Sequence, residues 1–139
     1  MREIDAAQSA VRAYIDGFNA RDAEQMANAF NFPHVRLAKG LFTHIESAAI
    51  FIERQDTVTE LLRDEGWHHT RIESMTAVHS GPDKVHLAIE FTRRQADASV
   101  YSRFNTLWIV TDQNNHWGVQ FRSSFLLSDA STLGPVSER

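Results

Sequence analysis

Hydrophobic residues recur every three or four positions in the first part of the chain, a spacing typical of helices that rest one face on a core. A first helix is predicted from the stripe formed by Ile4, Ala7, Val11, Tyr14, Ile15 and Phe18. Asp22 can cap a second, shorter helix, because Gln25 stands three residues later as in a capping box. Pro33 is expected to end that segment.

A short hairpin and a third helical stretch are expected next. Residues 34–37 and 41–45 alternate between apolar and polar side chains around Lys39–Gly40, which favours two strands joined by a tight turn. Ser47 is placed to cap the helical stretch that follows, and a kink in it is expected near residues 54–56.

The period falls to two after Gly66, and this is the period of a strand with one buried face. Four long strands are expected, at residues 67–79, 84–94, 99–111 and 116–126. Turn residues at 80–83 follow the first of these strands, and turn residues at 112–115 separate the last two. The last three strands are expected to form an antiparallel meander. Helices followed by such a meander predict an α+β fold, in which a curved antiparallel sheet packs against the N-terminal helices.

The pairing of the last two strands can be chosen by asking which register keeps apolar side chains on one face. A two-residue loop at positions 113–114 would set Trp108 opposite Val119. Phe104 and Phe121 then fall on the apolar face, where we expect them in the core. The helices are predicted to cover this face.

The opposite face of the sheet is predicted to mix charged and apolar side chains. Leu107 and Ile109 need cover there, so a second copy of the chain is expected to pack on them as a homodimer. The expected dimer face comprises Glu90, Arg103, Asn105, Leu107, Gln120 and Arg122. Glu90 and Arg103 are expected to form a cross-strand ion pair.

Length and composition limit the classes of protein. The 139 residues suit one domain, predicted over residues 1–127, with a flexible Ser-rich tail at 128–139. The formal net charge of -4 disfavours nucleic acid as a partner. Cysteine is absent, which excludes disulfides and thiolate chemistry. We find neither a signal peptide nor an apolar run long enough to span a membrane, so a soluble cytoplasmic protein is expected.

Two polar side chains are candidates for catalysis. His34 begins a strand and could act as a general base, or it could be a hydrogen-bonded structural histidine. The Tyr14 hydroxyl could enter a cavity as a donor, or it could bond to a backbone carbonyl. His68 and His69 should point to opposite faces of a strand and not chelate one metal ion, so neither a metal nor a cofactor is expected.

A pocket for a small apolar ligand is expected against the apolar face of the sheet, because an apolar cavity with a few polar groups is the usual small-molecule site. The residues expected to line it are Tyr14, Phe30, His34, His68, Phe104, Trp108, Trp117 and Phe121. Core packing is the alternative role for the aromatic members of this set.

Three stretches carry a resemblance to a known family: residues 10–20, Phe32-Pro33-His34 and residues 116–125. With this order of elements, residues 3–126 resemble the nuclear transport factor two-like superfamily, in particular its SnoaL-like small bacterial members. The resemblance implies a cystatin-like cone, in which the sheet curls around the helices and leaves an apolar cavity open at one end. Isomerases of the superfamily place a carboxylate base near the first hairpin, but residues 34–38 contain no carboxylate here.

The sequence leaves three functions open. A small-molecule-binding protein, or an enzyme of unknown reaction, would use the cone cavity. A dimeric assembly module without catalytic activity would use the outer face of the sheet. The resemblance implies, as a third alternative, an isomerase or dehydratase acting on a hydrophobic polycyclic or polyketide-like substrate. An enzyme needs a titratable group with a perturbed pKa in the cavity, whereas an assembly module does not.

Overall fold

The computed structural model describes residues 2–126 of the chain. Within this range the elements are α1 (Arg2–Ala20), α2 (Ala23–Asn28), β1 (Phe30–Ala38), β2 (Leu41–Ile45), α3 (Ala48–Glu53), α4 (Gln55–Asp64), β3 (His69–Ser80), β4 (Lys84–Arg94), β5 (Val100–Gln113) and β6 (His116–Ser124). The predicted order of helices and strands is thereby confirmed. The expectation that Pro33 ends the second helix is wrong, because α2 ends at Asn28 and Pro33 lies within β1. The predicted domain end at residue 127 and the predicted tail at 128–139 lie outside the described residues.

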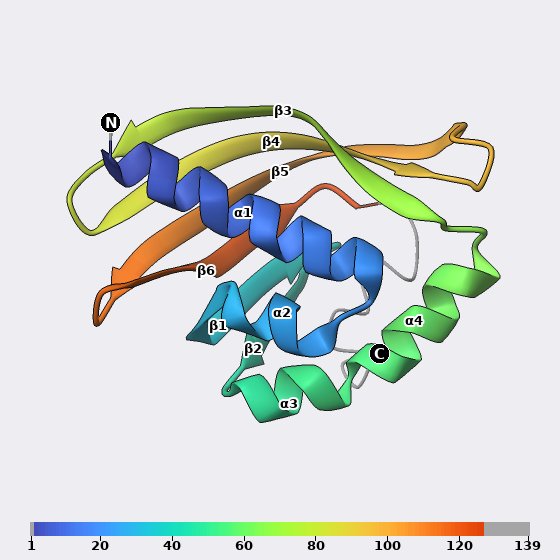
Figure 1. Cartoon of the computed structure of the whole chain (residues 1–139), viewed down its shortest axis with the longest axis horizontal. Helices are drawn as coiled ribbons and strands as arrows, with labels where there is room; N and C mark the ends of the chain where they lie inside the picture. Colours follow the sequence, from blue (N-terminus) through green and yellow to red (C-terminus); the bar gives the residue numbers. More distant parts are fainter. Residues whose placement is uncertain (1, 127–139) are drawn as a thin grey trace.

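The strands form one six-stranded sheet in the order β2-β1-β6-β5-β4-β3. Neighbouring strands are antiparallel except β1 and β6, which run parallel to each other. The sheet curves, α1 lies across one side of it, and the shorter helices group beside the β1–β2 hairpin (Figure 1). This architecture confirms the predicted α+β fold with a curved sheet packed against N-terminal helices.

The helix boundaries follow the capping residues of the sequence. The Asp22 carboxylate accepts a hydrogen bond from the backbone N–H of Gln25 at 3.1 Å, and the Ser47 hydroxyl accepts one from Ile50 at 3.3 Å. The Gln25 side chain does not close the predicted capping box, because its amide donates to the carbonyl of Ala13. The predicted kink is a full break at Arg54, between α3 and α4.

The core lies between the helices and the inner face of the sheet, defined here as the face that meets α1. The stripe predicted on the first helix is buried at Ala7, Val11, Tyr14, Ile15 and Phe18. β4 contributes Val85, Leu87, Ile89 and Phe91, each at most 3% exposed. The strict alternation of these four residues is the pattern that predicted their burial.

The predicted turn between the last two strands is wrong by one residue, and this changes the strand pairing by two. The turn residues are Asn114 and Asn115, with φ angles of 54° and 65°. Both lie in the left-handed region that a two-residue type I′ hairpin turn requires and that asparagine tolerates better than glutamine does. Val110 therefore pairs with Val119, and Trp117 pairs with Asp112.

A register shift beyond this point moves Arg122 to the inner face and Phe121 to the outer face. Gln120 is an extra residue between two ladder pairs, which is the geometry of a β-bulge. Trp108 consequently pairs with Arg122, while Phe121 pairs with Ile109. The prediction of Phe121 in the core and of Arg122 on the dimer face is wrong, because the bulge reverses the faces of both side chains.

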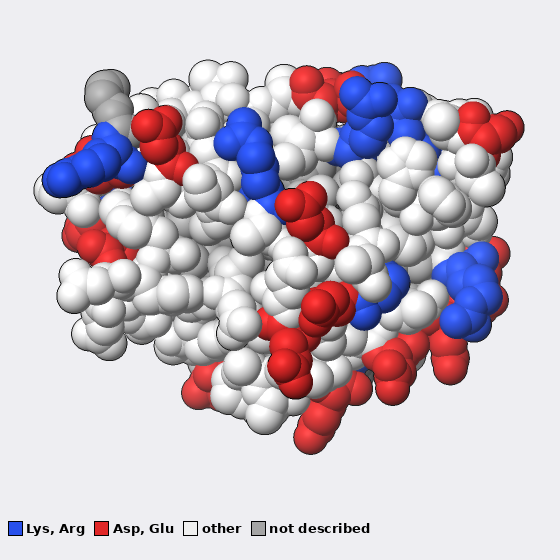
Figure 2. All heavy atoms as spheres, viewed as in Figure 1, with Lys and Arg blue, Asp and Glu red and all other residues white. Residues whose placement is uncertain are grey.

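On the surface of the molecule that carries α1, positively and negatively charged side chains are interspersed (Figure 2). Acidic groups gather along its lower edge, over α3 and α4, where Glu53, Asp56, Glu60 and Asp64 are exposed. The net charge of -4 leads one to expect such a surface. Among the described residues, none of the helices combines the length and the apolar character that crossing a membrane would require.

Candidate functional site

Two adjoining hollows lie between α1, the inner face of the sheet and the α3–α4 segment, and together they form the pocket discussed below. Each has a volume of about 40 Å³, which admits a small chemical group. Both hollows are lined by Tyr14, Phe18, Arg36, Arg93 and Arg122. The first is lined in addition by Ile15, Thr70, Phe91, Phe104, Trp108 and Ser124, and the second by Phe51, Gln55 and Val58.

Aromatic rings form the apolar wall of the pocket. The edge of Trp108 meets Tyr14 with ring centroids 5.4 Å apart, and the ring of Phe91 lies 5.3 Å from Trp108. Phe104 continues the wall at 5.7 Å from Phe91. These distances fall in the range of favourable aromatic pairs, so the wall is fixed by its own packing.

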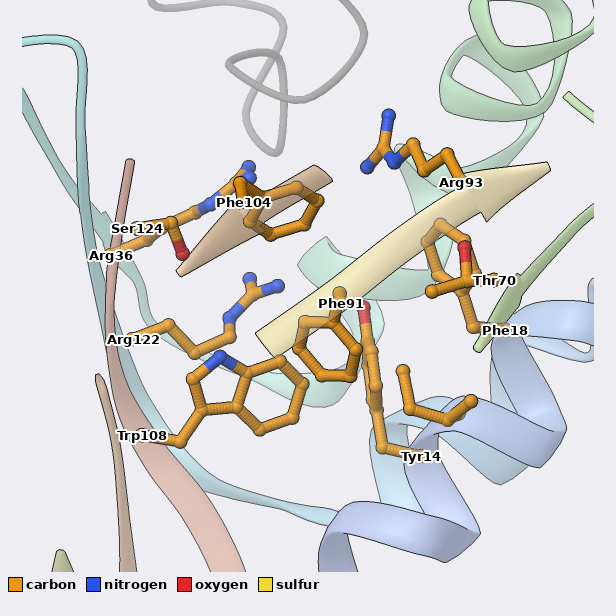
Figure 3. A pocket seen from close by; sticks show the side chains of 11 residues that line it. Tyr14, Phe18, Arg36, Thr70, Phe91, Arg93, Phe104, Trp108, Arg122 and Ser124 are labelled. Carbon is orange, nitrogen blue, oxygen red and sulfur yellow. The ribbon is translucent and has the colours of Figure 1, made fainter. Parts of the chain in front are cut away.

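Three buried arginines supply the polar side of the pocket. Arg36 comes from β1, Arg122 from β6 and Arg93 from β4, and each is at most 7% exposed. Their side chains reach the pocket from different sides, around Phe104 and Trp108 (Figure 3). Arg36 and Arg122 are direct neighbours in the parallel β1–β6 pairing. Buried arginines are uncommon unless they are paired or bind something, and the sequence reasoning missed all three.

Arg122 is held in place by His34. The Arg122 Nε–H donates to His34 Nε2 at 2.9 Å, and His34 Nδ1 lies 3.0 Å from the carbonyl oxygen of Val119. Since a carbonyl only accepts, Nδ1 must carry the proton, and Nε2 must be the acceptor. Both ring nitrogens of His34 are therefore engaged inside the protein.

The Arg122 guanidinium also rests among aromatic rings. Its Cζ atom lies 4.9 Å from the ring centroid of Phe30, 5.7 Å from that of Tyr14 and 5.8 Å from that of Trp108. Cation–π attraction of this kind partly offsets the cost of burying the charge. His34 stacks on the same Phe30 ring at 3.9 Å, so Phe30 supports both partners of the hydrogen bond.

Burial and positive neighbours hold the pKa of His34 well below its usual value. Burial of the ring is the largest cause, and the charge of Arg122 adds to it, while the Val119 carbonyl opposes them. A neutral His34 with both nitrogens engaged has no lone pair free for a substrate. Of the two roles that the sequence left open for His34, this geometry favours the structural one.

Arg93 is anchored at one end only. Its Nη1 atom lies 3.0 Å from the Glu65 carboxylate, which also accepts a hydrogen bond from the Tyr101 hydroxyl at 2.5 Å. Burial and this carboxylate raise the pKa of Tyr101. The Nε atom of Arg93 is buried and has no hydrogen-bond partner among residues 2–126. The Arg93 Cζ atom lies 5.7 Å from the centroid of Phe104.

The charged residues among the described lining of the pocket are all arginines. Burial lowers the pKa of Arg36 well below its usual value, and the charge of Arg122 lowers it further. Burial lowers the pKa of Arg122 as well, while the nearby Tyr14 hydroxyl raises it. Aspartate and glutamate are absent from the described residues that line the two hollows.

The structure brings together part of the predicted site. Tyr14, Phe104 and Trp108 line the pocket, as predicted from the sequence. Phe30 and His34 lie one layer behind it, where they support Tyr14 and Arg122.

The other three predicted residues lie elsewhere. Trp117 is on the inner face, but it packs at the far end of α1, beside Arg2 and Glu3. His68 is exposed, and Phe121 is on the outer face. These three residues therefore do not line the pocket. For Phe121 the cause is the bulge, and for His68 it is that the residue precedes β3 and is not part of it.

The two adjacent histidines do not diverge as predicted. Their Nδ1 atoms are 2.9 Å apart, because His68 lies before β3 and does not follow the alternation of a strand. Within the described range, no group of three or more His, Asp or Glu side chains could hold a metal ion. The expectation that the protein needs no metal stays a prediction.

Comparison with known proteins identifies the relatives of this chain. The family model described as "NTF2-like protein (DUF6841)" matches residues 2–121. No curated protein matches the chain significantly. An NTF2-like protein with a cystatin-like fold from Novosphingobium aromaticivorans is similar in structure, with a TM-score of 0.73 at 15% identity over 96% of this chain and 89% of that one.

Two further solved structures share the fold. A protein of unknown function with a cystatin-like fold from Nostoc punctiforme has a TM-score of 0.71 at 9% identity and covers 92% of this chain and 93% of its own. A ketosteroid isomerase-like protein from Erwinia carotovora atroseptica has a TM-score of 0.63 at 16% identity, with coverage of 91% and 97%. At these identities the likeness concerns the fold alone.

Proposed function

This chain belongs to the NTF2-like family, and we propose that it binds a small molecule in the pocket between α1 and the inner face of the sheet. The observation that carries the proposal is the meeting of an aromatic wall with three buried arginines at one pair of hollows. Such a combination of apolar surface and a few convergent polar groups is typical of ligand sites. The sequence-based resemblance to the superfamily is confirmed by the match over residues 2–121.

The chemistry of the lining favours binding over isomerisation. A proton-abstracting isomerase needs a base with a free lone pair beside its substrate. The described lining residues include no carboxylate, and His34 lies behind the wall with both nitrogens engaged. An isomerase or dehydratase acting on a polycyclic substrate would also need a larger cavity than two hollows of about 40 Å³ each.

Binding can be tested by nuclear magnetic resonance on the full ¹⁵N-labelled chain. In a screen of small fragments, binders should shift the indole N–H signal of Trp108, which lines the pocket, and leave that of Trp117, at the far end of α1, unchanged. Ser124→Phe would place a ring in the first hollow and should abolish these shifts. If no fragment moves the Trp108 signal, the proposed function is wrong.

We propose a second role for the outer face of the sheet, as the contact of a homodimer. With the corrected register, Leu107, Ile109 and Phe121 are neighbours on this face and are only half-buried. Glu90 and Arg103 form the predicted ion pair beside them at 3.1 Å. Apolar residues with charged neighbours suit the self-complementary contact of a twofold axis. The Gln120 amide accepts a hydrogen bond from the Thr111 hydroxyl and donates one to the Pro33 carbonyl. Its side chain is therefore engaged within the protein and adds little to this contact.

The expected result is a dimer in analytical ultracentrifugation of the full chain at micromolar concentration. Arg103→Glu should shift the equilibrium toward monomer, because it places like charges beside Glu90 at the contact. Arg12→Glu is the matched control, since Arg12 is exposed on α1, on the opposite side of the sheet. A wild-type protein that sediments as a monomer would contradict the proposal.

A further inference from the structure

We propose that the pocket binds the carboxylate group of a small organic acid, held by Arg122 and Arg93 against the aromatic wall. This inference rests on the proposed function and adds the chemical class of the ligand. It is drawn from the charge, the free hydrogen-bonding capacity and the size of the pocket.

The first argument is the uneven distribution of charge. Arg93 has a carboxylate partner in Glu65, but the nitrogen that receives the Nε–H of Arg122 belongs to a neutral imidazole. A carboxylate in the pocket would give the buried Arg122 guanidinium an anionic partner, whereas a neutral ligand would not.

The second argument is the hydrogen-bonding capacity that the protein leaves in the pocket. A guanidinium has five N–H donors in a planar fork, which matches the two oxygens of a carboxylate. His34 takes the Nε–H of Arg122 and the Tyr14 hydroxyl engages the same guanidinium, so the group is held in place while its five donors exceed these two partners. The buried Nε of Arg93 adds a donor that no described residue accepts.

The third argument is size. The hollows of about 40 Å³ each share five lining residues, and together they offer room for a short acid and not for a fused-ring compound. The rings of Trp108 and Phe91 would pack against the hydrocarbon part, while the guanidinium groups of Arg122 and Arg93 would face the oxygens (Figure 3). A carboxylate fits this division better than inorganic phosphate, which has no apolar part to place on Trp108 and Phe91.

The test compares propionate with propionamide, a neutral molecule of nearly the same shape. Both are titrated into the ¹⁵N-labelled full chain in a buffer free of carboxylate and phosphate, and binding is followed at the Trp108 indole N–H. Propionate is expected to bind at least about tenfold more tightly than propionamide, because charge-assisted hydrogen bonds form only with the anion. Arg122→Met should remove this preference, and Arg12→Met, an exposed arginine on α1, should leave it unchanged.

Each other outcome overturns a stated part of the inference. Equal affinity for the two probes in the wild type means that the pocket takes a neutral ligand, and the proposed function then stands without the carboxylate. Tighter binding of inorganic phosphate than of propionate also overturns the assignment. If neither probe shifts Trp108 but a neutral fragment does, only this inference fails, and if nothing shifts it, the proposed function fails as well. The wild-type comparison decides the matter even where Arg122→Met does not fold.

Discussion

Gly118→Ala is expected to destabilise the protein by about 3 kcal/mol or more, the upper range for overpacking in a well-packed interior. A Cβ atom at this position would lie 2.7 Å from the carbonyl carbon of Phe30 and 2.8 Å from the backbone nitrogen of Asn31. Both obstacles are backbone atoms, so no rotamer change can relieve the contact. Chemical denaturation of the variant and the wild type measures the loss.

The start of β1 cannot move away from Gly118 without further loss. The Asn31 side chain donates to the carbonyl oxygens of Thr111 and His116 at 3.0 Å, and the backbone N–H of Val119 donates to Ala29 at 2.8 Å. Gly81→Ala is the matched control, because its Cβ would meet nothing closer than 3.9 Å. The control should stay within about 0.5 kcal/mol of the wild type. A loss of less than about 1 kcal/mol in Gly118→Ala would show that β1 does not approach β6 this closely.

The free energy of unfolding is expected to decrease as the pH is lowered below about 6.5, by up to about 1.4 kcal/mol per pH unit, because of His34. The pKa of His34 is lowered in the folded state, so below its unfolded-state pKa the unfolded chain binds more protons than the folded one. His34 therefore contributes stability that is fully present above the unfolded-state pKa and is lost as the pH falls toward the folded-state pKa. Denaturant unfolding at about pH 7.5 and about pH 5.5 brackets the change.

His34→Gln separates this contribution from those of other groups. The amide keeps one donor for the Val119 carbonyl and one acceptor for Arg122, but it does not titrate. His69 and His86, whose pKa values are also lowered by burial, are present in both proteins and cancel in the comparison. The variant should lose less stability than the wild type between the two pH values. Equal losses would mean that His34 is protonated in the folded protein.

The sequence predicted the parts of the fold that depend on local patterns. The stripe on α1, the caps at Asp22 and Ser47 and the alternation in β4 each act within a few residues, and each is confirmed. The pairing of β1 with β6 joins segments far apart in the chain, and no local pattern announces it. The bulge at Gln120 is likewise not announced by the local alternation of apolar and polar residues.

The arginines of the pocket were missed for two different reasons. Arg122 changes face because of the bulge, which the sequence does not reveal. Arg93 could have been found, because it continues the inward alternation of β4 two residues after Phe91. In β1 the apolar neighbours Val35 and Leu37 suggest that Arg36 points outward, yet Arg36 is buried and its neighbours are only half-buried. Burial was predicted here from the positions of apolar residues, so a buried arginine cannot be predicted in this way.

The parallel pairing of β1 with β6 also sets the order in which the protein can acquire its pocket. Arg36 and Arg122 meet only when this contact forms, and it closes the longest loop between paired strands in the described sheet. Closing a long loop costs more chain entropy than forming the adjacent hairpins of β3 to β6, so the meander can assemble first. A partly folded chain with an intact meander would thus lack one wall of the cavity. A ligand can therefore bind only to the completed fold. A bound ligand would slow only those unfolding steps in which β1 separates from β6.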